Sequence, residues 1–90
     1  DAKKFIKSTL AERFIIVKKI TDKIADEEMS RSSVVEFLND IEKEILNESE
    51  TEELKRKNSF LFEEIDKCRS YVGDRSPSIK MLLEYMAIIL

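Results

Sequence analysis

Residues 76–90 read SPSIKMLLEYMAIIL, and this stretch specifies a helix with more apolar surface than one small core requires. Ser76 is a typical N-cap, and Pro77 suits the first helical position, where its missing N–H costs nothing. At about 100° per residue, one apolar stripe of this helix faces a core. The members of that stripe are Ile79, Leu82, Leu83, Met86, Ile89 and Leu90.

A second apolar ridge lies on another side of the same helix. It consists of Met81, Tyr85 and Ile88, at spacings of four and three. A helix that joins one core normally carries polar residues opposite its apolar stripe. Either the rest of the domain or another polypeptide therefore covers this ridge, and its three residues are candidate partner-interface residues.

The composition of the 90 residues indicates one small helical domain. One Gly and one Pro leave little turn chemistry for hairpins, and 42% hydrophobic residues are too many for a disordered chain. A chain of this length buries roughly two thirds of its unfolded surface, which is enough for a single core. Since Asp1 is not an initiator Met, we expect residues 1–90 to be a single domain and the C-terminal fragment of a longer protein.

Periodic apolar positions predict four helices joined by short connections. We expect the helices at residues 9–24, 33–47, 51–72 and 76–90. Residues 2–7 either extend the first helix or form a turn before it. The inward stripes of the first three helices are Leu10, Phe14, Val17, Ile20 and Ile24; Val34, Leu38, Ile41 and Ile45; and Leu54, Leu61, Ile65, Cys68 and Val72. Short connections make consecutive helices antiparallel, so the expected fold class is all-α, a bundle of four main helices in up-and-down order or a close variant.

Capping residues mark the expected helix boundaries. Thr9 and Ser33 each stand three residues before a Glu, which is the spacing of a capping box. Thr51 is expected to cap the third helix, and Gly73 to end it in the left-handed conformation that Gly adopts readily. Asn58 falls within the inward stripe of that helix, either as a partly exposed residue or as a hydrogen-bonded register point.

Two aromatic residues of the third helix, Phe60 and Tyr71, lie off its inward stripe. Each either packs against a neighbouring helix or joins the same interface as the terminal ridge. Large apolar residues on second faces are what a protein–protein interface needs. The candidate partner interface therefore consists of Met81, Tyr85, Ile88, Phe60 and Tyr71.

The residue types used in catalysis and in cofactor binding are scarce. The chain has no His, and its one Gly cannot build a Gly-rich phosphate loop. The lone Cys68 cannot form an internal disulfide or a zinc site, and its place on an apolar stripe predicts a small buried hydrophobe. Carboxylate pairs such as Asp40 with Glu44 are typical of exposed helix surface. We expect no catalytic residue, cofactor or metal ligand here, and hence no enzyme.

The charge pattern argues against a nucleic-acid surface or a membrane anchor. The formal net charge is −3, and acidic residues flank the densest basic run, KRK at 55–57. Such interleaving is typical of a solvated helix face, whereas nucleic-acid surfaces gather basic residues into a patch. The apolar C-terminal run is shorter than the 20 or so residues that span a bilayer, and no secretory signal is present, so a cytoplasmic location is expected.

Four segments, taken in order, resemble a known family. They are STLAERF (8–14), SVVEFLNDI (33–41), CRSYV (68–72) and DRSPSIKMLLEYM (74–86). This order is similar to the C-terminal helical domain of bacterial DNA polymerase III clamp-loader subunits, the delta-prime type above all. Members of that family often end with a Pro and a helix rich in Leu-Leu-Glu, as Pro77 and residues 82–84 do here. The acidic residues at 48–53 depart from the family pattern.

The resemblance implies a collar module without catalytic activity. In that family, such domains from five subunits pack side by side into a ring and hold the upstream ATPase-fold domains together. The complete assembly then places a sliding clamp on primed DNA. The partners implied are the other clamp-loader subunits, while contacts to nucleotide and DNA belong to the rest of the complex. The alternatives are the collar of a gamma/tau subunit, a helical adaptor that binds a partner helix in a groove, and a nucleic-acid-binding bundle.

Overall fold

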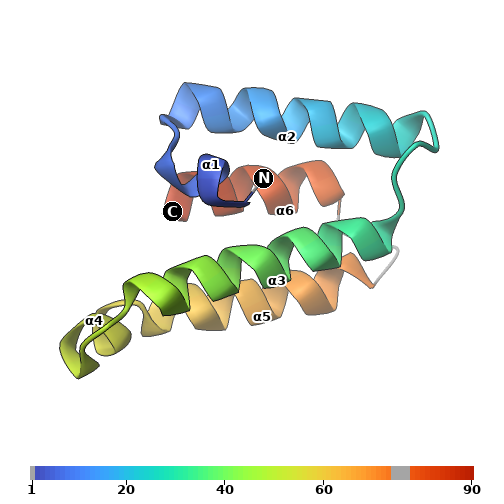
Figure 1. The fold of residues 1–90 in the computed structure, drawn as a ribbon. Helices are drawn as coiled ribbons and strands as arrows, with labels where there is room; N and C mark the ends of the chain where they lie inside the picture. The colour runs from blue at the N-terminus through green and yellow to red at the C-terminus, as the bar shows by residue number, and fades with distance from the viewer. Residues whose placement is uncertain (1, 74–77) are drawn as a thin grey trace.

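The computed structural model of this chain describes residues 2–73 and 78–90, which form an all-α bundle (Figure 1). The helices are α1 (Ala2–Lys7), α2 (Leu10–Ala25), α3 (Arg31–Glu48), α4 (Glu52–Lys57), α5 (Ser59–Val72) and α6 (Ile79–Ile89). No strand occurs in the part of the chain that the structure describes. The expected all-α fold with four main helices is confirmed, since α2, α3, α5 and α6 are the long ones.

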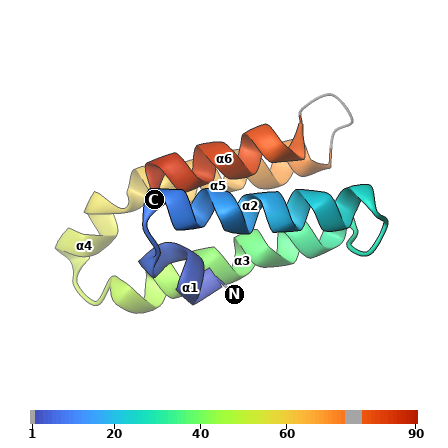
Figure 2. The same cartoon turned by 90° about the horizontal axis from the view of Figure 1, so that it is seen from above.

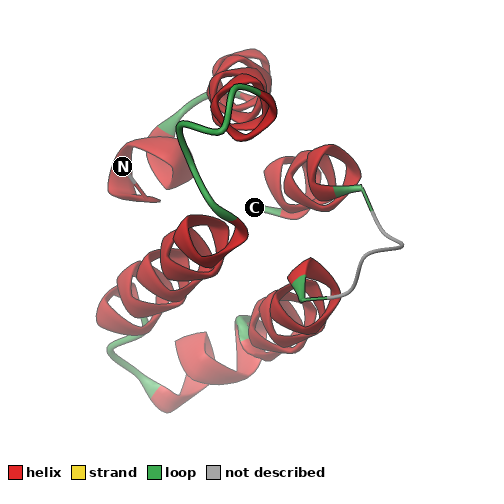
Figure 3. Ribbon diagram, turned by 90° about the vertical axis from the view of Figure 1, so that its right-hand side faces the viewer, coloured by secondary structure: helices red, strands yellow, loops and turns green. Residues whose placement is uncertain are grey.

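The four long helices alternate in direction and surround one core (Figures 1 and 3). Helix α2 packs on α6, α6 on α5, and α5 on α3. Although α2 and α3 are consecutive long helices, they do not pack closely on each other; the short α1 packs on both and lies between them at one end (Figures 1 and 2). The ring of helices is therefore closed everywhere except along part of the gap between α2 and α3.

The core draws apolar side chains from α1 and from every long helix. Its buried members are Ala2, Phe5, Val17, Val34, Leu38, Ile41, Ile45, Ile65, Cys68, Val72, Ile79, Leu83, Met86 and Ala87. The predicted inward stripes are thus confirmed in α3, and in α5 from Ile65 onward. The prediction that Leu10 and Leu54 face inward is wrong, since they are 47% and 38% exposed. Leu10 begins its helix and Leu54 lies in α4, which sits at one end of the bundle (Figure 1).

Residues 2–7 form a separate helix because the next helix has its own N-cap. The Thr9 hydroxyl accepts a hydrogen bond from the Glu12 backbone N–H at 3.3 Å, and the Glu12 carboxylate accepts one from the Thr9 N–H at 3.5 Å. The predicted capping box is therefore confirmed. Helix α1 is held to the bundle by Phe5, which is fully buried and meets the Phe37 ring edge to face at 5.3 Å between centroids.

Helix α3 begins three residues earlier than a cap at Ser33 would place it, so that prediction is wrong. Ser30 is the N-cap, but its hydroxyl accepts no hydrogen bond from a backbone N–H of the first turn. Its hydroxyl instead lies 2.7 Å from that of Ser32 and 3.4 Å from that of Ser33. These serines hydrogen-bond to one another, and the capping box predicted at Ser33 does not form.

The predicted third helix is divided into α4 and α5 at Asn58. The Asn58 amide donates to the Ser49 hydroxyl at 2.7 Å, and that hydroxyl donates to the Ile45 carbonyl at 2.7 Å. Asn58 is partly exposed as well, so both interpretations of this residue hold. The predicted cap Thr51 is confirmed, because its hydroxyl accepts a hydrogen bond from the Leu54 N–H at 3.1 Å.

Helix α5 ends at Val72 as expected, but not for the expected reason. Gly73 has φ −72° and ψ −20°, so the predicted left-handed conformation is wrong. The predicted Ser76 cap and the first helical position at Pro77 lie outside the described residues. Within them, α6 begins at Ile79 with Ser78 as its N-cap, whose hydroxyl accepts a hydrogen bond from the Met81 N–H at 3.4 Å.

Candidate protein-interaction surface

Helix α6 buries one side and exposes another. Ile79, Leu83, Met86 and Ala87 are buried, while Leu82, Ile89 and Leu90 are half-buried and pack against the same core. The opposite ridge stays in solvent: Met81 is 71%, Tyr85 38% and Ile88 62% exposed. The domain's own side chains therefore leave much of this ridge uncovered, and its need for a cover, inferred from the sequence, remains unmet within the bundle.

Helix α5 carries a second exposed stripe. Phe60 is 52% and Tyr71 is 46% exposed. Glu64 and Lys67 lie between them at spacings of four, three and four residues, which places all four on one side of the helix. About half of each aromatic side chain is therefore covered by the domain, and the other half is exposed to solvent.

The exposed stripes of α5 and α6 adjoin. The two helices pack on each other and run in opposite directions (Figure 2). Tyr85, in the middle of the α6 ridge, interacts with Glu64, in the middle of the α5 stripe. All five predicted interface residues are therefore brought to one side of the bundle. We call this surface the α5/α6 face, made of Phe60, Tyr71, Met81, Tyr85 and Ile88.

Glu64, next to the α5/α6 face, interacts both with Lys67 and with Tyr85. Glu64 Oε1 lies 3.5 Å from Lys67 Nζ. Partial removal from water, and then the hydrogen bond and charge of Glu64, raise the pKa of Tyr85. The phenol therefore stays protonated and offers both an apolar ring and a hydroxyl, the combination that favours Tyr at interfaces.

Cys68 lies beneath this surface and has a structural role. It is only 2% exposed, as its place on the apolar stripe predicted. Burial, and then the negative charge of Glu64, raise the pKa of the Cys68 thiol, so the reactive thiolate is disfavoured.

The described residues contain no constellation of metal ligands. Among residues 2–73 and 78–90, no group of three or more His, Cys, Asp or Glu side chains could hold a metal ion. Nor does any helix in these ranges have the length and apolar character needed to cross a bilayer. What the α5/α6 face offers chemically is burial of apolar surface against another molecule.

The sequence analysis missed a groove between α2 and α3. Its volume is about 280 Å³, and its lining includes Ile16, Lys19, Ile20, Lys23, Val34 and Phe37. One signal for it was present: on α2, apolar and basic residues share a side at spacings of three and four. Its existence nevertheless depends on α1 lying between two helices, which this spacing does not reveal.

No protein-family model, curated protein or solved structure matches the chain. The case for a function therefore rests on the α5/α6 face together with the order of segments in the sequence.

Proposed function

We propose that these residues form the non-catalytic collar domain of a bacterial DNA polymerase III clamp-loader subunit of the delta-prime type, which supports sliding-clamp loading in DNA replication. The observation that carries the proposal is the α5/α6 face, where five large apolar side chains lie exposed on one side of a small bundle. The sequence resemblance supplies the identity of the assembly.

The composition of the α5/α6 face supports a contact between folded proteins. Aromatic residues and Met are enriched at the centres of such interfaces, and these types account for four of the five residues. Glu64 and Lys67 neutralise each other on the α5 stripe, between Phe60 and Tyr71, so the face carries no net charge there. Hot spots cluster where large side chains are fully desolvated, and Tyr85 between Met81 and Ile88 is the natural centre.

The partners under this proposal are the other clamp-loader subunits in the cytoplasm. Nucleotide and DNA are bound by other parts of the assembly, and the domain contributes assembly alone. The collar of a gamma/tau subunit is the nearest alternative, since it would use the same kind of surface.

Photo-crosslinking tests the proposal. A photoreactive amino acid replaces Ile88 in the protein that carries this chain, and the protein is then mixed with the remaining clamp-loader subunits. We expect crosslinks to a neighbouring subunit, because Ile88 is 62% exposed on the proposed interface. The same group at Glu28, in the exposed turn between α2 and α3, serves as the control. Crosslinks of equal yield from both positions, or none from position 88, would contradict the proposal.

A helical adaptor remains a second candidate function, and the groove between α2 and α3 favours it. The two candidates differ in what precedes Asp1 in the encoded protein. An ATPase-fold domain there favours the collar, whereas its absence favours the adaptor.

A further inference from the structure

The groove between α2 and α3 has an apolar floor. Ile16 and Ile20 line it from α2, and Val34 and Phe37 line it from α3. Val34 is buried, while the other three are half-buried, so parts of their side chains face the groove. Met29, in the turn that joins the two helices, closes one end. Helix α1 limits the other end, where Phe5 supports the ring of Phe37 from behind.

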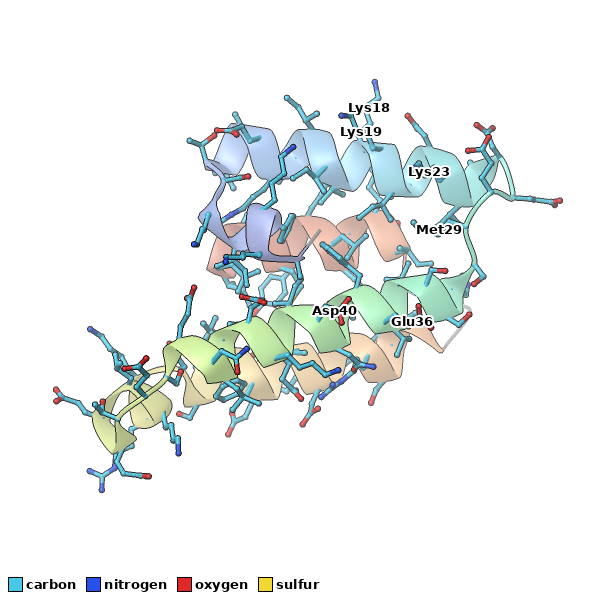
Figure 4. The ribbon with its side chains drawn as sticks, viewed as in Figure 1. Lys18, Lys19, Lys23, Met29, Glu36 and Asp40 are labelled. Atoms are coloured by element: carbon cyan, nitrogen blue, oxygen red, sulfur yellow. The ribbon has the colours of Figure 1, made fainter. Side chains whose placement is uncertain are left out.

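The two rims of the groove carry opposite charges (Figure 4). Lys19 and Lys23 lie on the α2 rim and line the groove directly. On the α3 side, the exposed carboxylates Glu36 and Asp40 follow the lining residues Ser33 and Phe37 by three positions each, so they lie outside the groove lining, on its α3 border. No ion pair joins the α2 lysines to the α3 carboxylates across the opening.

The opposite charges extend beyond the rims. In the sequence, residues 1–25, a range that includes α1 and α2, contain seven Lys or Arg against three Asp or Glu, whereas residues 26–90 contain nine against sixteen. The groove thus lies at the boundary between a basic and an acidic part of the molecule. A ligand in it meets a positive potential on one flank and a negative potential on the other.

We infer that this groove binds an amphipathic helix of a partner protein that carries acidic residues on the flank facing α2 and basic residues on the flank facing α3. Its volume of about 280 Å³ lies at the lower end of the roughly 300–1,000 Å³ range of ligand pockets. That volume accommodates one or two large apolar side chains, which a helix presents at positions i and i+4. Complementary flanking charges then fix the direction of the bound helix.

This inference is independent of the proposed collar function. Because the helices follow the order α2, α6, α5, α3 around the core, the gap between α2 and α3 lies opposite the α5/α6 face (Figure 3). A partner in the groove therefore leaves Phe60, Tyr85 and Ile88 accessible.

A designed peptide tests the inference. The probe is a 16-residue helical peptide with Leu at i, i+4 and i+7, Glu along one flank and Lys along the other. We expect binding to the 90-residue chain, with shifts of the methyl NMR signals of Ile20 and Val34. Lys23→Glu should weaken binding about five- to tenfold, since it turns an attraction into a repulsion, and exposed pairs contribute a few-fold each.

Lys18→Glu is the matched control for this experiment. It makes the same change of charge on a different side of α2, where Lys18 lines a hollow between α2 and α6. It should alter the affinity less than twofold. Both lysines are exposed, so both variants are expected to keep the melting profile of the parent chain.

The direction of the bound peptide gives the most specific readout. A nitroxide at the peptide's N-terminus broadens signals at one end of the groove, either near Met29 or near Lys4. Exchange of the Glu and Lys flanks should move the broadening to the other end. The inference is overturned if the direction is unchanged, if no binding occurs at 1 mM peptide, if the shifts fall on α5 and α6, or if a second copy of the chain occupies the groove. None of these results would affect crosslinks from position 88, so they leave the collar proposal standing.

Discussion

Arg13 joins three helices through one side chain. Its Nε donates to the Phe5 carbonyl at 3.0 Å, Nη2 donates to the Ile6 carbonyl at 2.6 Å, and Nη1 donates to the Ala87 carbonyl at 3.0 Å. These carbonyls lie in the last turns of α1 and α6, where most acceptors lack a partner within the helix; the Phe5 carbonyl also accepts a hydrogen bond from the Ser8 N–H at 3.3 Å. The guanidinium also places a positive charge at the negative ends of two helix dipoles.

Replacement of Arg13 by Met should lower the free energy of unfolding by about 2–3 kcal/mol. Three hydrogen bonds from a charged donor are lost, although the partly buried carbonyls regain some water. Urea titration followed by circular dichroism measures the change. Lys18→Met on the same helix is the control, and it should stay within about 0.5 kcal/mol of the parent, as surface substitutions usually do. A loss for Arg13→Met no larger than the control's would show that the network is not stabilising.

At the scale of elements, α1 fills the end of the bundle that the four long helices leave open. Phe5 has no exposed surface, and its ring packs on Phe37 of α3. Helix α1 also packs on α2, so it connects two helices that otherwise barely meet. A six-residue helix is not stable by itself, and this packing is what maintains it.

Phe5→Ala should therefore cost about 3–5 kcal/mol of unfolding free energy, the usual loss for a fully buried aromatic residue. Because a domain of this size has only about 5–15 kcal/mol in total, Phe5→Leu is the milder companion variant. Thermal melts of both, compared with Leu10→Ala at a half-exposed position, measure the effect. If Phe5→Ala were as stable as Leu10→Ala, α1 would not be part of the cooperative fold.

The sequence predicted those elements whose signals are local. The capping box at Thr9 and the apolar repeats of α3 and α6 arise from neighbours three and four residues apart, so they could be read from the sequence directly. The break at Asn58 could not, because it is coupled to a hydrogen bond with Ser49, a buried residue on another segment. The sequence did not predict whether residues 2–7 form a separate helix, because the main anchor of α1 is the ring of Phe37, which is distant in sequence.

The candidate surface was predictable residue by residue but not as a surface. The ridge on α6 follows from spacing alone, but the spacing left open whether the domain itself covers the ridge, and only the structure shows it exposed. Its meeting with Phe60 and Tyr71 depends on the register of α5 against α6, which the interaction of Tyr85 with Glu64 reveals. To predict the groove, one would also have to know that α1 lies between α2 and α3.

At the scale of the whole molecule, two surfaces with partly uncovered apolar side chains lie on opposite sides of one bundle. The α5/α6 face is broadly exposed and carries an internally neutralised ion pair, whereas the groove is narrow and has charged rims. Because the two surfaces lie on opposite sides, a partner on one of them leaves the other accessible.

The central claim is that the α5/α6 face is uncovered in the bundle because another subunit covers it. The most direct test changes Ile88 to Glu and compares it with Ile15→Glu, which introduces the same change at a similarly exposed apolar position on α2, 56% against 62%. Circular dichroism reports folding, and a quantitative pull-down with the other clamp-loader subunits reports assembly. We predict that both variants fold like the parent, that Ile88→Glu weakens assembly at least about tenfold, since a charge is desolvated without a partner, and that Ile15→Glu does not. Normal assembly of Ile88→Glu, or its unfolding, would contradict the account.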